Sequence, residues 1–166
     1  MSAELATYEP ESTLMVWARE AREAHAIAQS LASTAFVSST LRGKPNEVTG
    51  AILTGHEVGL APMASVRSID VISGTPAMRA VAMRALLQSH GHKVRIKEQT
   101  ATRAVVVGWR ADETEADAQT STWTIERAQR LGLTGKDNWQ KQPEAMLVAR
   151  ATAECCRWVA SDVLLG

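Results

Sequence analysis

Two strand-like segments, residues 93–99 and 102–109, constrain the fold of this chain more than any other feature. The first, KVRIKEQ, alternates cationic and apolar side chains, which is the two-residue period of a strand with two different faces. This period places Val94 and Ile96 on one face and Lys93, Arg95 and Lys97 on the other. The second, TRAVVVGW, is rich in valine, and a turn near Thr100 makes the two segments a predicted hairpin.

Helical segments are predicted on both sides of this hairpin. Amphipathic spacing, caps and stop signals predict helices over 12–33, 46–58, 79–90, 125–131 and from about 143 to 160. Strand-like composition predicts three further strands, at 65–72, 75–78 and 122–124. The order of these elements predicts an α+β fold, with a small, mainly antiparallel sheet and helices packed on it. We see no repeat or linker, so a single domain over residues 1–166 is expected.

Composition sets the class of protein. The chain has 166 residues, 45% of them apolar, which is enough for one domain with a real core. No apolar run approaches the roughly 20 residues that a membrane-spanning helix needs. The acidic N-terminus does not resemble a signal peptide, and the adjacent Cys155 and Cys156 are expected to be free thiols in the core. We therefore expect a cytoplasmic protein with no membrane partner.

Charge is unevenly distributed along a chain whose formal net charge is zero. Between Arg67 and Arg110 there are eight cations and only two acids, so this segment carries a net charge of +6. An acidic stretch, 112–117, follows at once. Such segregation points toward a polyanionic partner.

No catalytic signature is recognisable. Asp137 follows Gly135-Lys136 where a phosphate-binding loop needs Ser or Thr, and neither a G-x-S-x-G nor an H-E-x-x-H motif occurs. His90 is interpreted as a helix-end residue and His92 as a surface residue, rather than as metal ligands. We therefore expect no enzyme activity, no catalytic residue, no metal and no cofactor.

The alternating cations instead predict contact with nucleic acid. On a strand, every second side chain recurs at about 6.6 Å, close to the span of one nucleotide in an extended backbone. The alternative is a solvated sheet face. The residues predicted to contact DNA are Lys93, Arg95, Lys97 and Arg103 in a groove, flanked by Arg67, Arg79, Arg150 and Arg157, with Lys136, Trp139 and Lys141 near its edge.

Two of these predictions have open alternatives. Arg150 and Arg157 lie seven residues apart on one helix face, and Glu154 between them could form an intrahelical ion-pair ladder instead. Trp139 could stack on a base or fill the core beneath the last helix.

Three segments together resemble one family. GHEVGLAPMASVRSIDVISGTPAMRAVAMRALLQSHG has a Gly-Leu-x-Pro step, a strand, a glycine turn and a helix that ends in glycine. WTIERAQRLGL follows, and WQKQPEAMLVARATAECCRWVASDVLLG has a Trp, a Pro-x-x-Met-Leu, an Arg-Ala pair and a later Asp-x-Leu-x-Gly. Over residues 30–166 the chain resembles the phage RecT family of single-strand DNA annealing proteins. It departs from the family pattern at the Gly74-Thr75-Pro76 turn.

This resemblance implies a β-β-β-α core and ATP-independent annealing of complementary strands in recombination. It also implies binding to single-stranded DNA and nascent duplex, assembly into rings or helical filaments, and a phage exonuclease as partner. From the same resemblance we expect a phage or prophage gene expressed in a bacterial host. We also expect a further C-terminal region after Gly166. Two alternatives remain: a sequence-specific duplex-binding regulator that uses Arg150 and Arg157, and a phage structural or assembly protein without a DNA role.

Overall fold

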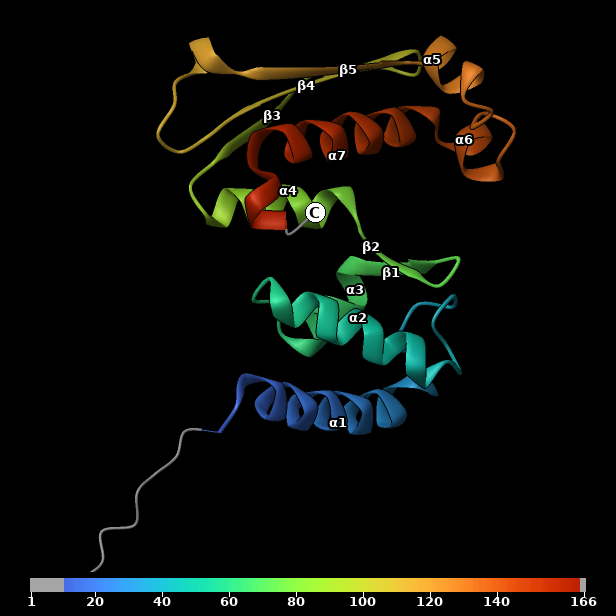
Figure 1. Ribbon diagram of the computed structural model, residues 1–166. Coiled ribbons are helices and arrows are strands. Elements are labelled where there is room, and N and C mark those ends of the chain that lie inside the picture. The colour runs from blue at the N-terminus through green and yellow to red at the C-terminus, as the bar shows by residue number, and fades with distance from the viewer. Residues whose placement is uncertain (1–10, 165–166) are drawn as a thin grey trace, which may run out of the picture. The chain divides into compact units, whose positions relative to one another are not determined.

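The computed structural model describes residues 11–164, which form two compact units (Figure 1). Unit 1 contains residues 11–67 and 71–76, and unit 2 contains residues 68–70 and 77–164. A two-stranded sheet, formed by β1 (Ile69–Ile72) and β2 (Thr75–Met78), contributes residues to both units. Each unit has its own cluster of buried apolar side chains.

Unit 1 is built on the predicted N-terminal helix, which is α1 (Thr13–Ala32). The Ser12 hydroxyl caps it by accepting a hydrogen bond from the Met15 N–H. Its buried face is made of Ala24, Ala28 and Ala32, and these small side chains let α2 (Pro45–Glu57) approach closely. The helix predicted over 46–58 is this α2, which begins one residue earlier, with Pro45 in its first turn.

The strand predicted over 65–72 is wrong in its first half. Residues 62–68 form a third helix, α3 (Pro62–Ser68), and only Ile69–Ile72 form a strand. Proline suits the first position of a helix because its missing N–H has no partner there anyway. Gly55 of α2 accommodates this helix, because a Cβ at residue 55 would lie 2.1 Å from the Ser65 hydroxyl oxygen.

Unit 2 contains the predicted hairpin. Its three-stranded antiparallel sheet has the order β3 (Lys93–Gln99), β4 (Arg103–Trp109) and β5 (Gln119–Thr124), so β3 is an edge strand. The Thr100 hydroxyl accepts a hydrogen bond of 2.9 Å from the Arg103 N–H and fixes the turn. The strand predicted over 122–124 begins earlier, at Gln119, and a short 3-10 turn, η1 (Glu115–Asp117), lies in the β4–β5 connection.

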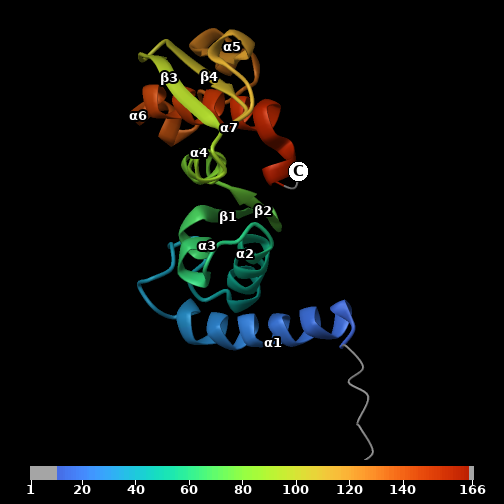
Figure 2. The ribbon, with the colours of Figure 1, turned by 90° about the vertical axis from the view of Figure 1, so that its left-hand side faces the viewer.

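One face of this sheet is covered by the C-terminal helix, α7 (Pro143–Leu164), as Figures 1 and 2 show. The core between them contains Val94, Val106 and Trp123 from the sheet and Leu147 and Cys155 from α7. The predicted helix over 79–90 is α4 (Ala80–Ser89), which packs on α7 and on β3. Two short helices, α5 (Ile125–Arg130) and α6 (Asp137–Lys141), connect β5 to α7.

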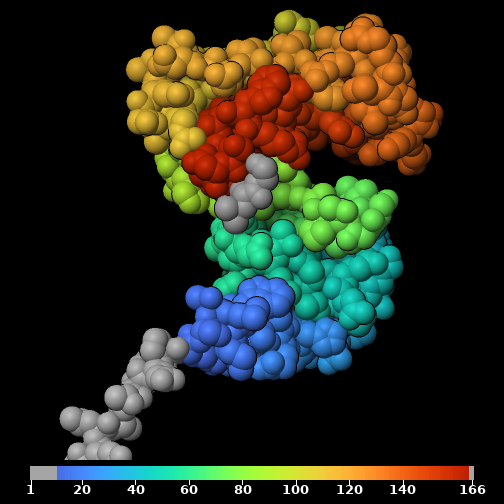
Figure 3. All heavy atoms as spheres, in the orientation of Figure 1, coloured from blue at the N-terminus to red at the C-terminus, as the bar shows by residue number. Residues whose placement is uncertain are grey.

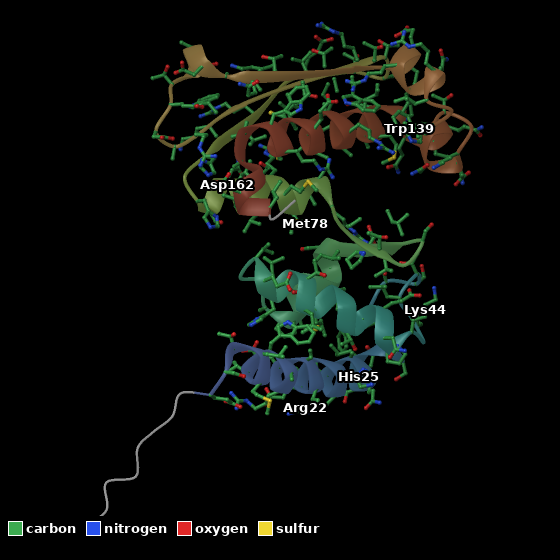
Figure 4. The ribbon with its side chains drawn as sticks, viewed as in Figure 1. Arg22, His25, Lys44, Met78, Trp139 and Asp162 are labelled. Atoms are coloured by element: carbon green, nitrogen blue, oxygen red, sulfur yellow. The ribbon has the colours of Figure 1, made fainter. Side chains whose placement is uncertain are left out.

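The far end of α7 is tied to β4 by one arginine. The helix kinks at Ala160, and the Arg110 guanidinium donates hydrogen bonds to the Val159 carbonyl and to both carboxylate oxygens of Asp162. These hydrogen bonds lower the pKa of Asp162 to about 2. Asp162 and Trp139 mark the opposite ends of the α6–α7 segment in Figure 4.

The fold class is therefore α+β, as predicted, with two small antiparallel sheets and helices packed on them. Among residues 11–164, no helix combines the length and the apolar character that crossing a bilayer requires.

Gly108 is the tightest point between β4 and α7, and this generates the first prediction. A Cβ at residue 108 would lie 2.8 Å from the Lys93 carbonyl oxygen and about 3 Å from side chains of Val159 and Cys155. We expect Gly108→Ala to lower the free energy of unfolding by about 1–3 kcal/mol through overpacking. Urea unfolding followed by tryptophan fluorescence measures this, because four of the five tryptophans lie in unit 2.

Gly135→Ala is the matched control, because a Cβ there meets no atom within 4 Å. Equal stability of the two variants would contradict the packing described for α7.

Candidate nucleic-acid interface

The predicted alternation of β3 is confirmed by the structure. Val94 is fully buried beneath α7, whereas Lys93, Arg95 and Lys97 are exposed. The side chains of these cations therefore lie on the sheet face opposite α7, which we call the outer face. The outer face places Lys93 beside Trp109 of β4 and Arg95 beside Val107.

The row of cations is not evenly spaced along its whole length. The pairing of β3 with β4 shifts by one residue between Ile96 and Glu98, which is a β-bulge with Lys97 as the extra residue. The even spacing of about 6.6 Å that the sequence predicted therefore applies to Lys93 and Arg95. The bulge brings Lys97 and Glu98 to successive positions at the outer face.

Two of the four cations in the predicted groove bind carboxylates. The Lys97 ammonium lies 2.7 Å from a carboxylate oxygen of Glu115 in η1, and the Arg103 guanidinium lies 2.5 Å from Glu98. Among the described residues, Lys93 and Arg95 have neither an ion pair nor a side-chain hydrogen bond. The outer face thus presents two unpaired and two paired cations.

The acidic stretch after β4 folds back over this face. The hydrogen bond and the charge of Lys97, with a smaller effect from Arg95, hold the pKa of Glu115 below its ordinary value. The turn is fixed by a reciprocal cap, in which Thr114 and Asp117 exchange backbone and side-chain hydrogen bonds. This chain therefore supplies its own carboxylate to one end of the basic row.

Apolar and hydroxyl side chains complete the outer face. Val105 and Val107 of the central strand lie beside Thr122 and Thr120 of β5, respectively. Trp109 is only 9% exposed, so its ring is not presented for stacking. The exposed donors of this face are cations and hydroxyls, which suit phosphate oxygens better than base rings.

Arg79 and Arg67 were predicted to flank the groove. Arg79 donates two hydrogen bonds, of 2.6 and 2.8 Å, to the carboxylate of Asp70, and this pair raises the pKa of Arg79. Arg67 is exposed in α3 and belongs to unit 1, whereas Arg79 belongs to unit 2.

The structure places Arg150 and Arg157 on α7, away from the outer face. Because α7 covers the opposite face of the sheet, the sheet itself separates these two arginines from Lys93 and Arg95. The prediction that they flank the same groove is therefore not met by the geometry. The space-filling view shows one flank of α7 exposed beneath β5 (Figure 3).

Glu154 does not form the intrahelical ladder that the sequence left open. Its carboxylate instead accepts hydrogen bonds from Arg127 on α5, from the Ser121 hydroxyl and from the Trp123 indole. Burial alone would raise the pKa of Glu154, but these hydrogen bonds and the Arg127 charge outweigh it and lower the pKa. Arg127 also lies over the Trp123 ring, 4.1 Å from its centroid.

The loop before α7 offers cations but no aromatic platform. Lys136 and Lys141 are exposed, and Lys141 pairs with Asp137 at 3.0 Å. Trp139 is 4% exposed and belongs to the core of unit 2, so base stacking by its ring is excluded and the core alternative is right.

Three residues of interest to catalysis lie in the interior. Burial raises the pKa of Cys155 to about 12 and that of Cys156 to about 11, so neither thiol is an activated nucleophile. Both are core residues, as predicted.

His92 was expected at the surface, but it is only 7% exposed, and its Nδ1 accepts a hydrogen bond from the Ala111 N–H. No group of three or more His, Cys, Asp and Glu within residues 11–164 is arranged to hold a metal ion.

Sequence reasoning missed two residues that the structure brings to this region. Glu115 was noted only as part of the acidic stretch 112–117, and no local pattern indicates that it reaches Lys97. Arg84 was counted among the cations of the basic segment but was not singled out, although it lies beside β3.

Comparisons with known proteins give no matching family model and no match among curated proteins.

The hydrogen bonds of Glu154 generate the second prediction. Its side chain is 19% exposed, and Glu154→Gln leaves the Arg127 charge without its partner. We expect a loss of about 2 kcal/mol in the free energy of unfolding at pH 7. Because the folded pKa is depressed, this contribution is present above about pH 4.5 and is lost as the pH falls through the folded pKa.

Urea unfolding at pH 7 and at stepwise lower pH measures this effect, with Glu144→Gln as the control. Glu144 is an exposed carboxylate on the same helix. A Glu154→Gln variant as stable as the control at pH 7 would contradict the role given to Glu154.

Proposed function

We propose that this chain binds single-stranded DNA through its phosphates and anneals complementary strands without ATP. The observation that carries the proposal is the pair of exposed cations Lys93 and Arg95 on the outer face, which form no ion pair with any residue in 11–164. The sequence resemblance to the phage RecT family supports it independently.

A grip on phosphates predicts a particular mode of binding. The outer face has ammonium, guanidinium and hydroxyl groups, whereas Trp109 and Trp139 are buried. Binding that rests on ion contacts depends strongly on salt and little on base sequence. This behaviour is what an annealing protein needs, because it must accept many sequences and leave their bases free to pair.

The paired cations of the outer face remain accessible to phosphate. Lys97 and Glu115 keep 47% and 61% of their side-chain surface exposed, and Arg103 and Glu98 keep 49% and 35%. Ion pairs this exposed contribute only about 0–1 kcal/mol each, so a phosphate group can replace the carboxylate. DNA would therefore compete with Glu115 for Lys97.

Annealing requires no covalent chemistry in this proposal. Two complementary strands repel each other through their phosphates, and cations on the protein reduce this repulsion for the strand that they bind. Neighbouring protomers would extend the track of cations along the strand. Self-association is therefore part of the proposal, and the exposed apolar side chains of α1, Leu14, Met15 and Trp17, are consistent with it.

The proposed setting follows the family resemblance. This proposal includes a ring or helical filament on DNA, a phage exonuclease as partner, and a phage gene acting in a bacterial cytoplasm.

Adding two complementary oligonucleotides one after the other, and measuring the mass of each complex, tests both annealing and self-association. Tight binding to one duplex sequence instead would favour the regulator.

The third prediction concerns the two unpaired cations. We expect Lys93→Glu with Arg95→Glu to weaken binding to a mixed-sequence single strand at least tenfold at low salt, because two phosphate contacts become repulsions. Fluorescence anisotropy with a labelled oligonucleotide measures the affinity, and a strand-annealing assay should lose rate in parallel.

The matched control changes the net charge equally in unit 1. Arg22 on α1 (Figure 4) and Arg42 after it are exposed, so Arg22→Glu with Arg42→Glu should bind nearly as well as the unaltered chain. Equal loss in both double variants would mean that only net charge matters, which contradicts a localised outer-face site.

The fourth prediction concerns Glu115. Because Glu115 competes with phosphate for Lys97, we expect Glu115→Gln to strengthen single-strand binding by about two- to fivefold. Asp112→Asn changes the charge of the same connection by the same amount, but Asp112 lies near Arg110, at 3.9 Å. If both variants gain equally, the specific competition at Lys97 is wrong.

A further inference from the structure

A polar depression lies in unit 2 between α4 and the edge strand β3. Its volume is about 260 Å³, and it is lined by Arg84, Gln88, His92, Lys93, Val94 and Arg95. Three of these residues are cations, and none is an acid. Figure 2 shows β3 at an edge of the sheet with α4 beneath it in the view.

Arg84 is the unusual residue of this depression. It is half-buried on α4, and its Nε is the one buried side-chain nitrogen or oxygen among the described residues that lacks a hydrogen-bond partner. No carboxylate within residues 11–164 pairs with it. A buried donor without a partner costs about 1–3 kcal/mol, so native structures normally satisfy such a group with an acceptor.

The other side chains supply donors of the same kind. Among the described residues, the ammonium of Lys93 and the guanidinium of Arg95 have no ion pair. The Nδ1 of His92 accepts from the Ala111 N–H, so a neutral ring carries its proton on Nε2 and can donate from there. The Gln88 amide donates to the Val94 carbonyl at 3.4 Å and holds α4 against the strand edge.

We infer that this depression binds one phosphate group, with Arg84 as its principal ligand. A guanidinium donates two parallel hydrogen bonds to the oxygens of a phosphate, and Lys93 adds a point charge. An oxyanion would offset the three positive charges of the depression together. The inference goes beyond the proposed function, since the depression can hold a phosphate whether or not DNA follows the outer face.

Two sources can deliver this phosphate group. A phosphodiester within a strand carries one negative charge, whereas a terminal monoester carries about 1.5–2 at pH 7 and offers three acceptor oxygens. Because Lys93 and Arg95 also belong to the outer face, either an internal or a terminal phosphate of a bound strand is within the reach of the same cations.

The primary experiment uses inorganic phosphate alone. We expect amide NMR signals of residues 88 and 92–95 to shift saturably when phosphate replaces chloride at constant ionic strength. Arg84→Gln and Lys93→Gln should each weaken this binding at least fivefold, and Arg22→Gln should leave it unchanged. Lys93 is exposed, so its variant keeps the test valid even if Arg84→Gln disturbs the packing of α4.

Two results would overturn the inference. One is the absence of saturable shifts, or shifts of similar size at cations all over the chain. The other is phosphate binding that survives unweakened in either Arg84→Gln or Lys93→Gln.

A second arm compares 5′-phosphorylated with unphosphorylated oligonucleotides. A gain in affinity on phosphorylation that Arg84→Gln abolishes identifies the strand end as the source, and equal weakening of both oligonucleotides identifies an internal phosphate. Phosphate binding without any binding of oligonucleotide would refute the proposed function and leave the depression as a phosphate site. Oligonucleotide binding that Arg84→Gln does not affect, in a protein that binds no inorganic phosphate, would refute the phosphate site in the depression and leave the proposed function standing.

Discussion

The packing of α7 on one face of the three-stranded sheet determines which side chains the other face presents. Gly108 allows the close approach, Glu154 binds side chains of β5 and α5, and Arg110 ties the end of β4 to the end of α7. With its apolar face covered in this way, β3 directs its cations, Lys93, Arg95 and Lys97, outward. The candidate interface is therefore a consequence of the core, and any change that loosens α7 should disturb both.

Ion pairs in unit 2 fall into two classes with different consequences. Glu154 is only 19% exposed and its carboxylate accepts hydrogen bonds from Arg127, Ser121 and Trp123, so its pair with Arg127 contributes to the fold. Lys97 and Glu115 are exposed, so their pair contributes little stability and can exchange with an external anion. Arg84 belongs to neither class, because it is half-buried and no carboxylate in the described part of the chain pairs with it. This contrast separates cations that hold the structure together from cations that remain for a ligand.

Sequence periodicity correctly predicted the elements whose structure depends on neighbouring residues. It failed for features that depend on contacts between residues far apart in the chain. The hairpin, the outward face of β3 and the long helices were predicted because alternation and amphipathic spacing are local. The strand expected over 65–68 is a helix because Pro62 starts one and Gly55 makes room for it. The burial of Trp139 and the partner of Glu154 depend on residues far along the chain, and the bulge at Lys97 leaves no mark on the alternation.

The salt dependence of single-strand affinity tests the central claim most directly. If phosphates are the ligands, the logarithm of the association constant falls linearly with the logarithm of salt concentration, with a slope of about −0.7 for each phosphate contacted. Two to four contacts per protomer predict a slope between about −1.4 and −2.8, the same for oligonucleotides of unrelated sequence. An affinity that does not change with salt, or that follows base sequence, would contradict the account.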